Sequence, residues 1–321
     1  IYRDNNQTDM TRTKRDGVYR FMLEEDLKYA IAHLPRLRPN EMEHNGAVTA
    51  FTAEMLAAKV NLMLGDYAEV ERLTEDIIGS KKFELFGDFF KSAGKLCDES
   101  MFEVQLTNFG TGSGDEIRPG EFFVFQGPAN SGTISGWGFI GFEKEFMKWA
   151  EDRGETVRAT TTFLKGGETT PSGDFIKGAS NPTATNVWNG KAYLPKSETL
   201  EGRGYGSGNN VRVFRYADVL LMNSEAKIRQ GKNGDYGYNK IRKRAKMQEK
   251  SGVTLEEVLD ERRMELACEW GERYLDLLRT GKAQEVLGTK GWTPEKAYYP
   301  IPFEQLTNSP SLNNAPIDYL P

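Results

Sequence analysis

The sequence predicts a mainly α-helical protein in which tetratricopeptide-like helix pairs form a helical frame, with a loop-rich aromatic middle segment that contains short strands. Apolar residues recur at helical spacing in residues 13–92 and again in residues 213–282. More than half of the 33 glycines fall between these stretches, in residues 107–210. Glycine disfavours helices, so the middle of the chain is expected to be mostly loop.

The first helical stretch predicts one amphipathic helix followed by a helix hairpin. Pro35 ends the first helix, and Gly65-Asp66 makes the turn of the hairpin. Small alanines at positions 53, 57 and 58 let the two hairpin helices approach closely. This pattern is typical of a tetratricopeptide-like pair. The apolar face of the first helix is formed by Leu23, Leu27, Ala30, Ile31 and Leu34.

The middle segment predicts two short strands and one short helix. The strands are "SMFEVQLT" and "EFFVFQ", and the helix is "FEKEFMKWAEDRG". On a strand, Phe123 and Phe125 share one face and Phe122 takes the other. Loops held on a rigid frame often carry binding residues, so we look for a site here.

The second helical stretch predicts a helix in "VFRYADVLLMNSEAKIRQGK" (residues 213–232), with "YNKIRKRAK" as its partner. Thr254 and Glu257 form a capping-box pattern that opens a long helix, and Gly281 would end it. The apolar stripe of that helix includes Trp270, which we therefore assign to the core. The tail that follows is rich in proline and asparagine and is expected to lie extended over the domain surface.

The long helix carries "ERRMELACEWGERYLDLLR", in which acids alternate with arginines. Helical spacing predicts ion pairs Glu269–Arg273, Arg262–Glu265 and Asp276–Arg279. Neighbouring arginines lower carboxylate pKa values, whereas a catalytic acid needs a raised one. We therefore expect a structural role for this helix, and expect the basic "KIRKRAK" to pair with it.

Composition narrows the function classes. The net charge of −5 argues against a general nucleic-acid binder. The two cysteines form no CxxC pattern, and His33 and His44 are the sole histidines. His33 is expected to meet the last carbonyls of its helix, and His44 to lie in a solvated loop. We expect no catalytic residues, no metal and no cofactor.

Several stretches occur in an order that resembles the C-terminal part of the SusD/RagB family, surface glycan-binding lipoproteins of Bacteroidetes. Earlier helices and "AEDRGETVRATT" resemble the same family, and the likeness is weakest in residues 107–212. The ordered stretches are "FRYADVLLMNSEAKI", "YNKIRKRAK", "TLEEVLDERRMELACEWGERYLDLLRTG" and "YYPIPFEQLTNSPSLNNAPIDY".

The resemblance implies that residues 1–321 are a single domain. Its parts would be a helical frame (13–92), a loop-rich ligand-binding segment (100–212), a second part of the frame (213–282) and an extended C-terminal tail (283–321). The family's N-terminal portion, with its lipidated cysteine, is expected to be missing before Ile1. Membrane association would then depend on a lipid anchor not present in this chain.

The resemblance also implies a function. The protein would bind an oligosaccharide or polysaccharide at the outer-membrane cell surface, without catalysis, and deliver it to a SusC-like TonB-dependent transporter. Some members of the wider family handle peptides or glycoprotein glycans instead.

Flat aromatic rings suit the C–H faces of sugars, and polar side chains suit the hydroxyls. Trp137 in "SGWGF" is flanked by glycines that shield it little, and Trp188 in "NVWNGKAY" is similar. We predict ligand contacts at Trp137, Trp188, Phe123, Phe125 and Asn130.

Two alternatives stay open. The first is a tetratricopeptide-type protein-interaction module without sugar binding, in which the middle aromatics would be buried. The second is a glycoside hydrolase, which needs two carboxylates facing a cleft. Asp115, Glu116 and Glu121 lie near the aromatic zone and keep that second alternative open.

Overall fold

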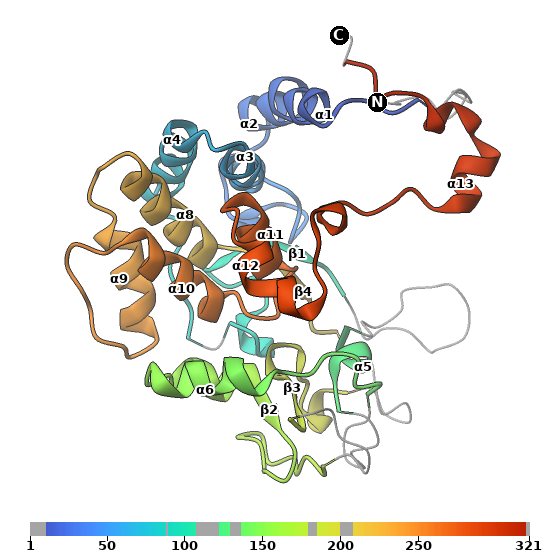
Figure 1. Cartoon of the computed structure of the whole chain (residues 1–321). Helices are drawn as coiled ribbons and strands as arrows, with labels where there is room; N and C mark the ends of the chain where they lie inside the picture. The colour runs from blue at the N-terminus through green and yellow to red at the C-terminus, as the bar shows by residue number, and fades with distance from the viewer. Residues whose placement is uncertain are drawn as a thin grey trace.

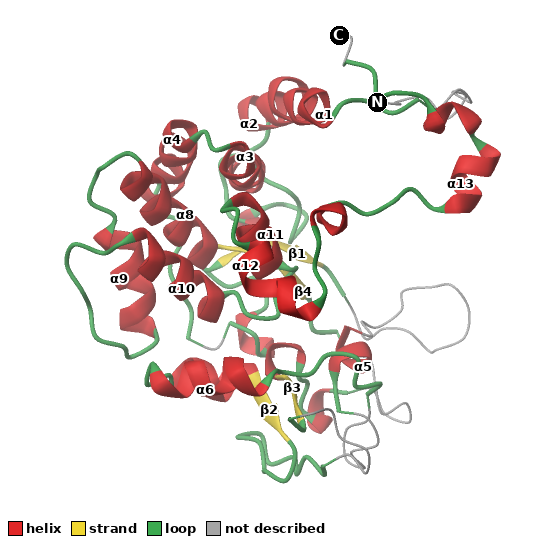
Figure 2. Cartoon of the chain, in the orientation of Figure 1, coloured by secondary structure: helices red, strands yellow, loops and turns green. Residues whose placement is uncertain are grey.

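The computed structural model describes residues 11–87, 89–106, 122–128, 136–178, 185–199 and 208–318. Helices dominate these residues, and the strands are few and short (Figure 2). The predicted mainly α-helical fold class is confirmed. The α-helices are α1 (Arg15–Phe21), α2 (Lys28–His33), α3 (Ala50–Leu64), α4 (Tyr67–Gly79), α5 (Phe122–Gln126), α6 (Lys144–Asp152), α7 (Val157–Thr162), α8 (Tyr216–Arg229), α9 (Asp235–Arg244), α10 (Leu255–Glu265), α11 (Glu272–Arg279), α12 (Ala283–Leu287) and α13 (Phe303–Asn308). The strands are β1 (Ser100–Val104), β2 (Phe163–Lys165), β3 (Val187–Asn189) and β4 (Val211–Arg215).

The frame begins with α1 and α2, which a π-helical turn at Met22–Leu27 joins into one continuous helix. This helix ends at His33, as Pro35 predicted, and Nδ1 of His33 lies 2.8 Å from the carbonyl oxygen of Tyr29. The hairpin of α3 and α4 is also confirmed. Gly65 ends α3 in the left-handed conformation (φ 79°), which glycine adopts without strain.

The core of the frame lies where α3, α4 and α8 pack together, and α9 and α10 pack against α8 (Figure 1). Burial of large apolar side chains is the main favourable term in forming such a core. Among the fully buried members of this cluster are Phe51, Met55, Leu73, Ile77, Leu220 and Leu221.

The described strands form two small antiparallel sheets, of which the β1–β4 sheet joins the start of the middle segment to the start of α8. Strand β1, predicted from the sequence, pairs with β4, so that Ser100 lies opposite Arg215 at the start of α8. Strands β2 and β3 pair with Leu164 opposite Trp188. The predicted short helix of the middle segment is α6.

The predicted strand "EFFVFQ" is wrong, because this stretch forms α5. A helical bond from the backbone N–H of Gly127 to the oxygen of Phe123 measures 2.7 Å. A short apolar run fits a strand or a helix equally well by periodicity. On the helix, Phe122 and Phe125 lie one turn apart and are partly exposed, while Phe123 is buried.

The predicted long helix is two helices, α10 and α11, with a break between them. Cys268 (φ 60°), Trp270 (φ 44°) and Gly271 (φ 73°) adopt left-handed backbone conformations in the break. The capping box of Thr254 and Glu257 is present at the start of α10. Trp270 is about half exposed, so its assignment to the core is wrong: the break turns the ring out of the apolar stripe.

The tail after α12 is extended apart from short helical turns, and it returns to the start of the chain (Figure 1). There the N–H of Lys14 donates to the oxygen of Ile317 at 2.7 Å, and Lys14 pairs with Asp318 at 3.0 Å. Tyr299 is 96% exposed, so this part of the tail does not pack on the domain as predicted. Across the described ranges, no helix has the length and apolar character needed to cross a membrane.

Candidate functional site

Partly exposed aromatic rings gather where α5, residues 136–139 and the break between α10 and α11 present side chains. We call this set the aromatic shelf. Its exposed fractions run from 38% for Phe122 to 71% for Phe139, so each ring offers surface to solvent. The members are Phe122, Phe125, Trp137, Phe139 and Trp270.

Backbone hydrogen bonds hold residues 136–139 against α5. The N–H of Trp137 donates to the oxygen of Val124 at 2.6 Å, and that of Phe139 donates to Phe125 at 3.0 Å. Glycine is needed beside Trp137, because a Cβ at Gly136 would lie 2.7 Å from the backbone of Gly127. The local sequence therefore brings the backbone close to α5 while leaving the indole of Trp137 uncovered.

Ring contacts orient the shelf. Trp137 meets Phe125 edge to face, with ring centroids 4.9 Å apart, and lies 5.6 Å from Phe139. Phe122 stacks on Trp270 at 6.0 Å. Aromatic contacts of this kind each contribute about 0.5–1.5 kcal/mol, so the rings hold one another in place.

A small cavity of about 50 Å³, lined by both apolar and polar residues, lies beside Phe122 and Trp270. Its volume suits one or two water molecules rather than a sugar ring. The polar groups that line it supply amide donors and acceptors and three charges at the edge of the shelf. These residues are Asn189, Lys191, Asn209, Asn210, Arg212 and Glu269.

The structure separates the five predicted ligand contacts into three groups. Trp137 and Phe125 are exposed and lie together on the shelf. Trp188 (0% exposed) and Phe123 (2% exposed) are core residues that pack with Leu164, so these two predictions are wrong. The reason is tertiary: β3 carries Trp188 into the cluster beneath α5. Asn130 lies outside the described residues.

Three shelf residues were missed from the sequence. Phe139 carries the same signal as Trp137, a glycine neighbour in "SGWGF", and it is more exposed. Phe122 was placed on the opposite face of a strand, but on the helix it lies near Phe125. Trp270 was assigned to the core, because the apolar spacing around it predicted one continuous helix.

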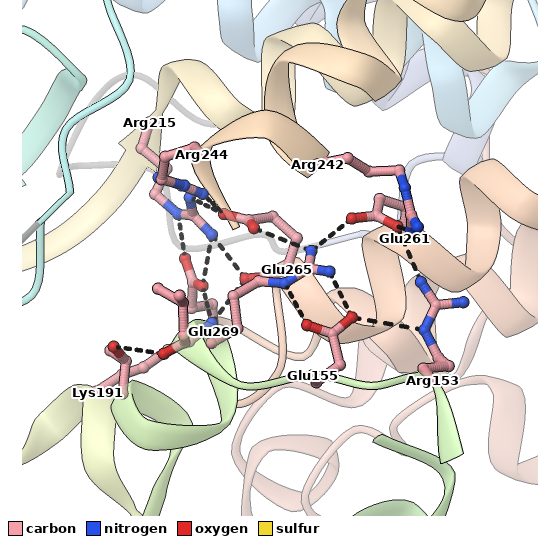
Figure 3. Close-up of polar contacts among 12 residues, drawn as sticks. Arg153, Glu155, Lys191, Arg215, Arg242, Arg244, Glu261, Glu265 and Glu269 are labelled. Atoms are coloured by element: carbon pink, nitrogen blue, oxygen red, sulfur yellow. Dashed lines mark hydrogen bonds and ion pairs between the residues drawn. The ribbon is translucent and has the colours of Figure 1, made fainter. Parts of the chain in front are cut away.

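A buried ionic network centres on two acids of α10, Glu261 and Glu265 (Figure 3). Glu261 accepts from Arg158 at 2.6 Å, from Arg153 at 2.8 Å and from Arg242 at 3.2 Å. Glu265 accepts from Arg215 at 2.6 Å and also pairs with Arg244. The expected pairing of "KIRKRAK" with the acidic helix is therefore confirmed by Arg242 and Arg244.

The ion pairs within the acidic stretch are mostly different from those predicted. Asp276 and Arg279 pair at 2.7 Å, as expected. Arg262 instead contacts Asp218 at 2.7 Å and Asp276 at 2.9 Å, which joins α8, α10 and α11. Glu269 pairs with Lys191 at 2.6 Å and Arg215 at 2.7 Å rather than with Arg273, so these two predicted pairs are wrong.

The electrostatics of the network oppose acid catalysis. Arg244, Arg215 and Arg158 outweigh the burial of Glu265 and hold its pKa well below the usual range. Lys59 and Arg262 likewise lower the pKa of Asp218. Carboxylates that stay ionised and paired suit a structural role, which agrees with the expectation from the sequence. The described residues contain no cluster of three or more His, Cys, Asp or Glu side chains arranged to hold a metal.

The helical frame and its few short strands define a mainly α-helical class of protein, and the comparisons with known proteins assign the family. Residues 142–317 match the SusD family, and the chain belongs to this family. A SusD-like protein of Bacteroides ovatus is 24% identical over 288 residues, covering 81% of this chain and 50% of that protein. SusD-like protein P38 of Formosa agariphila is 35% identical over 119 residues, covering 32% of this chain and 24% of its own length.

Solved structures share the fold. Surface glycan-binding protein A from Bacteroides thetaiotaomicron, in complex with laminarihexaose, superposes with a TM-score of 0.78 at 25% identity and covers 92% of this chain and 69% of that one. A laminarin binding SusD-like protein gives a TM-score of 0.76 at 26% identity, covering 92% and 68%. The chain spans half or less of the length of the curated relatives named above.

Proposed function

We propose that this protein binds a neutral oligosaccharide or polysaccharide on the aromatic shelf without cleaving it. The observation that carries the proposal is the group of exposed rings around Trp137, held by backbone bonds to α5. A rigid ring covers the C–H face of a sugar at little cost in conformational entropy.

Family membership supports a carbohydrate ligand. One similar structure contains laminarihexaose, and another is of a laminarin binding protein. Both ligands are neutral. A shelf of aromatic rings suits a neutral ligand better than a charged one.

A binding role without catalysis agrees with the chemistry of Glu265, a carboxylate of the buried network on α10. Hydrolysis of a glycosidic bond needs an acid with a raised pKa opposite a second carboxylate. Glu265, near the shelf, instead has a lowered pKa and several cationic partners. Asp115, Glu116 and Glu121, the candidates for the hydrolase alternative, lie outside the described residues. Product analysis after incubation with each glycan tests that alternative directly.

In the full-length protein, we propose that the bound glycan is delivered to a SusC-like TonB-dependent transporter at the outer-membrane surface. A lipid anchor on the full-length protein would hold it there. This part rests on family membership alone. Co-purification of the full-length protein with such a transporter from its source membrane tests it, and recovery of the protein without any transporter would contradict it.

A protein-interaction module without sugar binding is the second candidate. A groove of about 310 Å³ between the first helix and the α3–α4 pair favours it. Leu23, Leu27 and Ile31 give this groove an apolar floor, and Arg72 lies among its polar residues. If the protein retains no glycan, this candidate becomes the better account of the helical frame.

Affinity electrophoresis against a panel of neutral polysaccharides tests the main proposal. We expect Trp137→Ala to lose most of the retention seen with the wild type. Tyr299→Ala is the matched control, because it removes an exposed ring outside the shelf. Unchanged retention by Trp137→Ala would remove the shelf as the site, and a lack of retention of every glycan would reject carbohydrate binding.

A further inference from the structure

A second and larger hollow lies between α7, β2 and the turn that follows β2. Its volume is about 550 Å³, within the range of about 300–1,000 Å³ typical of small-molecule sites. None of its lining residues lines the small cavity beside the shelf. We call it the threonine cavity, after Thr156, Thr160, Thr169 and Thr170, which line it.

Helical geometry places hydroxyl groups along one wall of the threonine cavity. Thr156 and Thr160 are one turn apart at the start of α7 and so lie on the same face. Oγ1 of Thr160 donates to the backbone oxygen of Thr156 at 3.0 Å, which leaves its lone pairs to accept. Within the described ranges, the hydroxyls of Thr156 and Thr169 have no hydrogen-bond partner.

The part of the lining formed by Thr170 and Tyr193 is held in place by a chain of polar contacts. The hydroxyl of Tyr193 contacts Oγ1 of Thr170 at 2.9 Å and also donates to Asp174. The N–H of Lys196 donates to the same carboxylate at 2.9 Å. Because Asp174 accepts from both, the Tyr193 ring is fixed at the cavity edge rather than free to close it.

Apolar surface completes the lining and connects the cavity to the shelf. Pro171 is exposed and supplies C–H surface beside the hydroxyls, and the lining also includes the buried side chains of Phe163 and Leu164. Tyr193 also packs edge to face on Phe123 of α5, with centroids 6.1 Å apart. One core cluster therefore supports the cavity on one side and the helix that carries the shelf on the other.

The charges of the lining disfavour an ionic occupant. Glu155 is paired with Arg158, which lies within hydrogen-bond distance of both its oxygens. Lys165 lies 3.7 Å from Glu168. The cavity therefore has no excess of positive charge for an anion and, among its described residues, no metal-binding cluster. Hydroxyls beside apolar surface suit a neutral polyhydroxylated ligand.

We propose that the threonine cavity is a second carbohydrate-binding subsite, which takes a short segment of a neutral glycan. The proposal rests on the carbohydrate-binding function proposed above, and it adds a contact region separate from the shelf. Thr156, Thr160 and Thr169 hydrogen-bond the sugar hydroxyls, while the exposed ring of Pro171 contacts its C–H face.

Nuclear magnetic resonance of the threonine methyl groups and the Trp137 indole tests both regions in one titration. The probes are laminarihexaose, a xylogluco-oligosaccharide and the other neutral oligosaccharides of the panel. We expect a binding oligosaccharide to shift the methyl signals of Thr156, Thr160 and Thr169 as well as the indole signal. Thr160→Trp fills the cavity and should abolish the remaining methyl shifts while leaving the indole shift.

Thr161→Trp is the matched control, because Thr161 is the exposed neighbour on α7 and does not line the cavity. It should keep every shift. An indole shift without threonine shifts would overturn the second subsite and leave the shelf as the site. Threonine shifts without an indole shift would support the cavity and overturn the shelf. The absence of any shift across the whole panel would overturn both proposals.

Discussion

The indole Nε1 of Trp270 donates a hydrogen bond of 2.6 Å to the backbone oxygen of Arg212, which fixes the ring that stacks on Phe122. Trp270 has a φ of 44°, a conformation that few residues other than glycine adopt. Such a conformation costs about 1–3 kcal/mol and persists only where neighbours hold it. Strand β4 therefore positions a ring supplied by the break between α10 and α11.

Trp270→Phe keeps an aromatic ring and removes the hydrogen-bond donor. We expect glycan affinity to fall about 2–10-fold, since a hydrogen bond contributes about 0.5–1.5 kcal/mol net. Trp270→Ala should weaken binding more, because the stacked ring is lost. Isothermal titration calorimetry with a retained glycan measures both.

Trp292→Phe is the control for this pair of variants, since Trp292 donates its indole N–H to Tyr274 at 3.2 Å away from the shelf. It should bind as the wild type does. If Trp270→Ala binds with wild-type affinity, Trp270 is not part of the site.

Gly136→Ala tests the close approach of residues 136–139 to α5. The added methyl would lie 2.7 Å from the backbone of Gly127, so the segment must move. Overpacking of this kind costs about 1–3 kcal/mol, and we expect glycan affinity to fall about 10-fold as Trp137 is displaced. Gly87→Ala, where the methyl meets open space, is the control. Unchanged affinity of Gly136→Ala would mean that this approach does not set the position of the Trp137 ring.

The frame was predictable because its signals are local. Apolar spacing, the Thr254 capping box and the Gly65 turn each act within a few residues. The break at Trp270 was not predictable, since it depends on partners from other elements. Arg262 reaches Asp218 on α8, and Glu269 reaches Arg215, and neither contact is visible in the spacing of the acidic stretch.

The site was predictable only in part, for a related reason. Glycine neighbours indicated that Trp137 is exposed, and the structure agrees. The same argument failed for Trp188, because β3 pairs with β2 and carries that ring into the core. Glycine neighbours indicate that the adjacent residues do not cover a side chain. Burial by a distant strand depends on tertiary pairing, which the local sequence does not show.

Glu261→Ala tests whether the network in Figure 3 is structural. The change leaves Arg158, Arg153 and Arg242 without a shared buried partner, and such losses cost about 3–5 kcal/mol. We expect chemical denaturation to give an unfolding free energy lower by that amount. Asp152→Ala removes an exposed pair with Lys148 and should cost less than about 1 kcal/mol. Equal effects of the two variants would contradict a stabilising role for the buried network.

The pKa of Glu54 is raised, whereas the pKa of Glu265 in the buried network is lowered. The two carboxylates therefore change the stability of the protein with pH in opposite directions. Burial raises its pKa to about 7, although Arg36 lies 2.5 Å away and opposes the shift. The usual value of 4.5 applies to the unfolded chain, so the folded protein holds the proton more tightly. This contribution to stability is complete below pH 4.5 and is lost as the pH rises through about 7.

Urea unfolding of the wild type and Glu54→Gln between pH 5 and pH 8 tests this relationship. The Gln variant cannot ionise, so the unfolding free energy of the wild type should fall relative to it as the pH rises. Asp152→Asn, at an exposed carboxylate, should follow the wild-type curve. Parallel curves for Glu54→Gln and the wild type would show that Glu54 binds its proton no more tightly in the folded protein than in the unfolded chain, and the pairing with Arg36 would then outweigh burial.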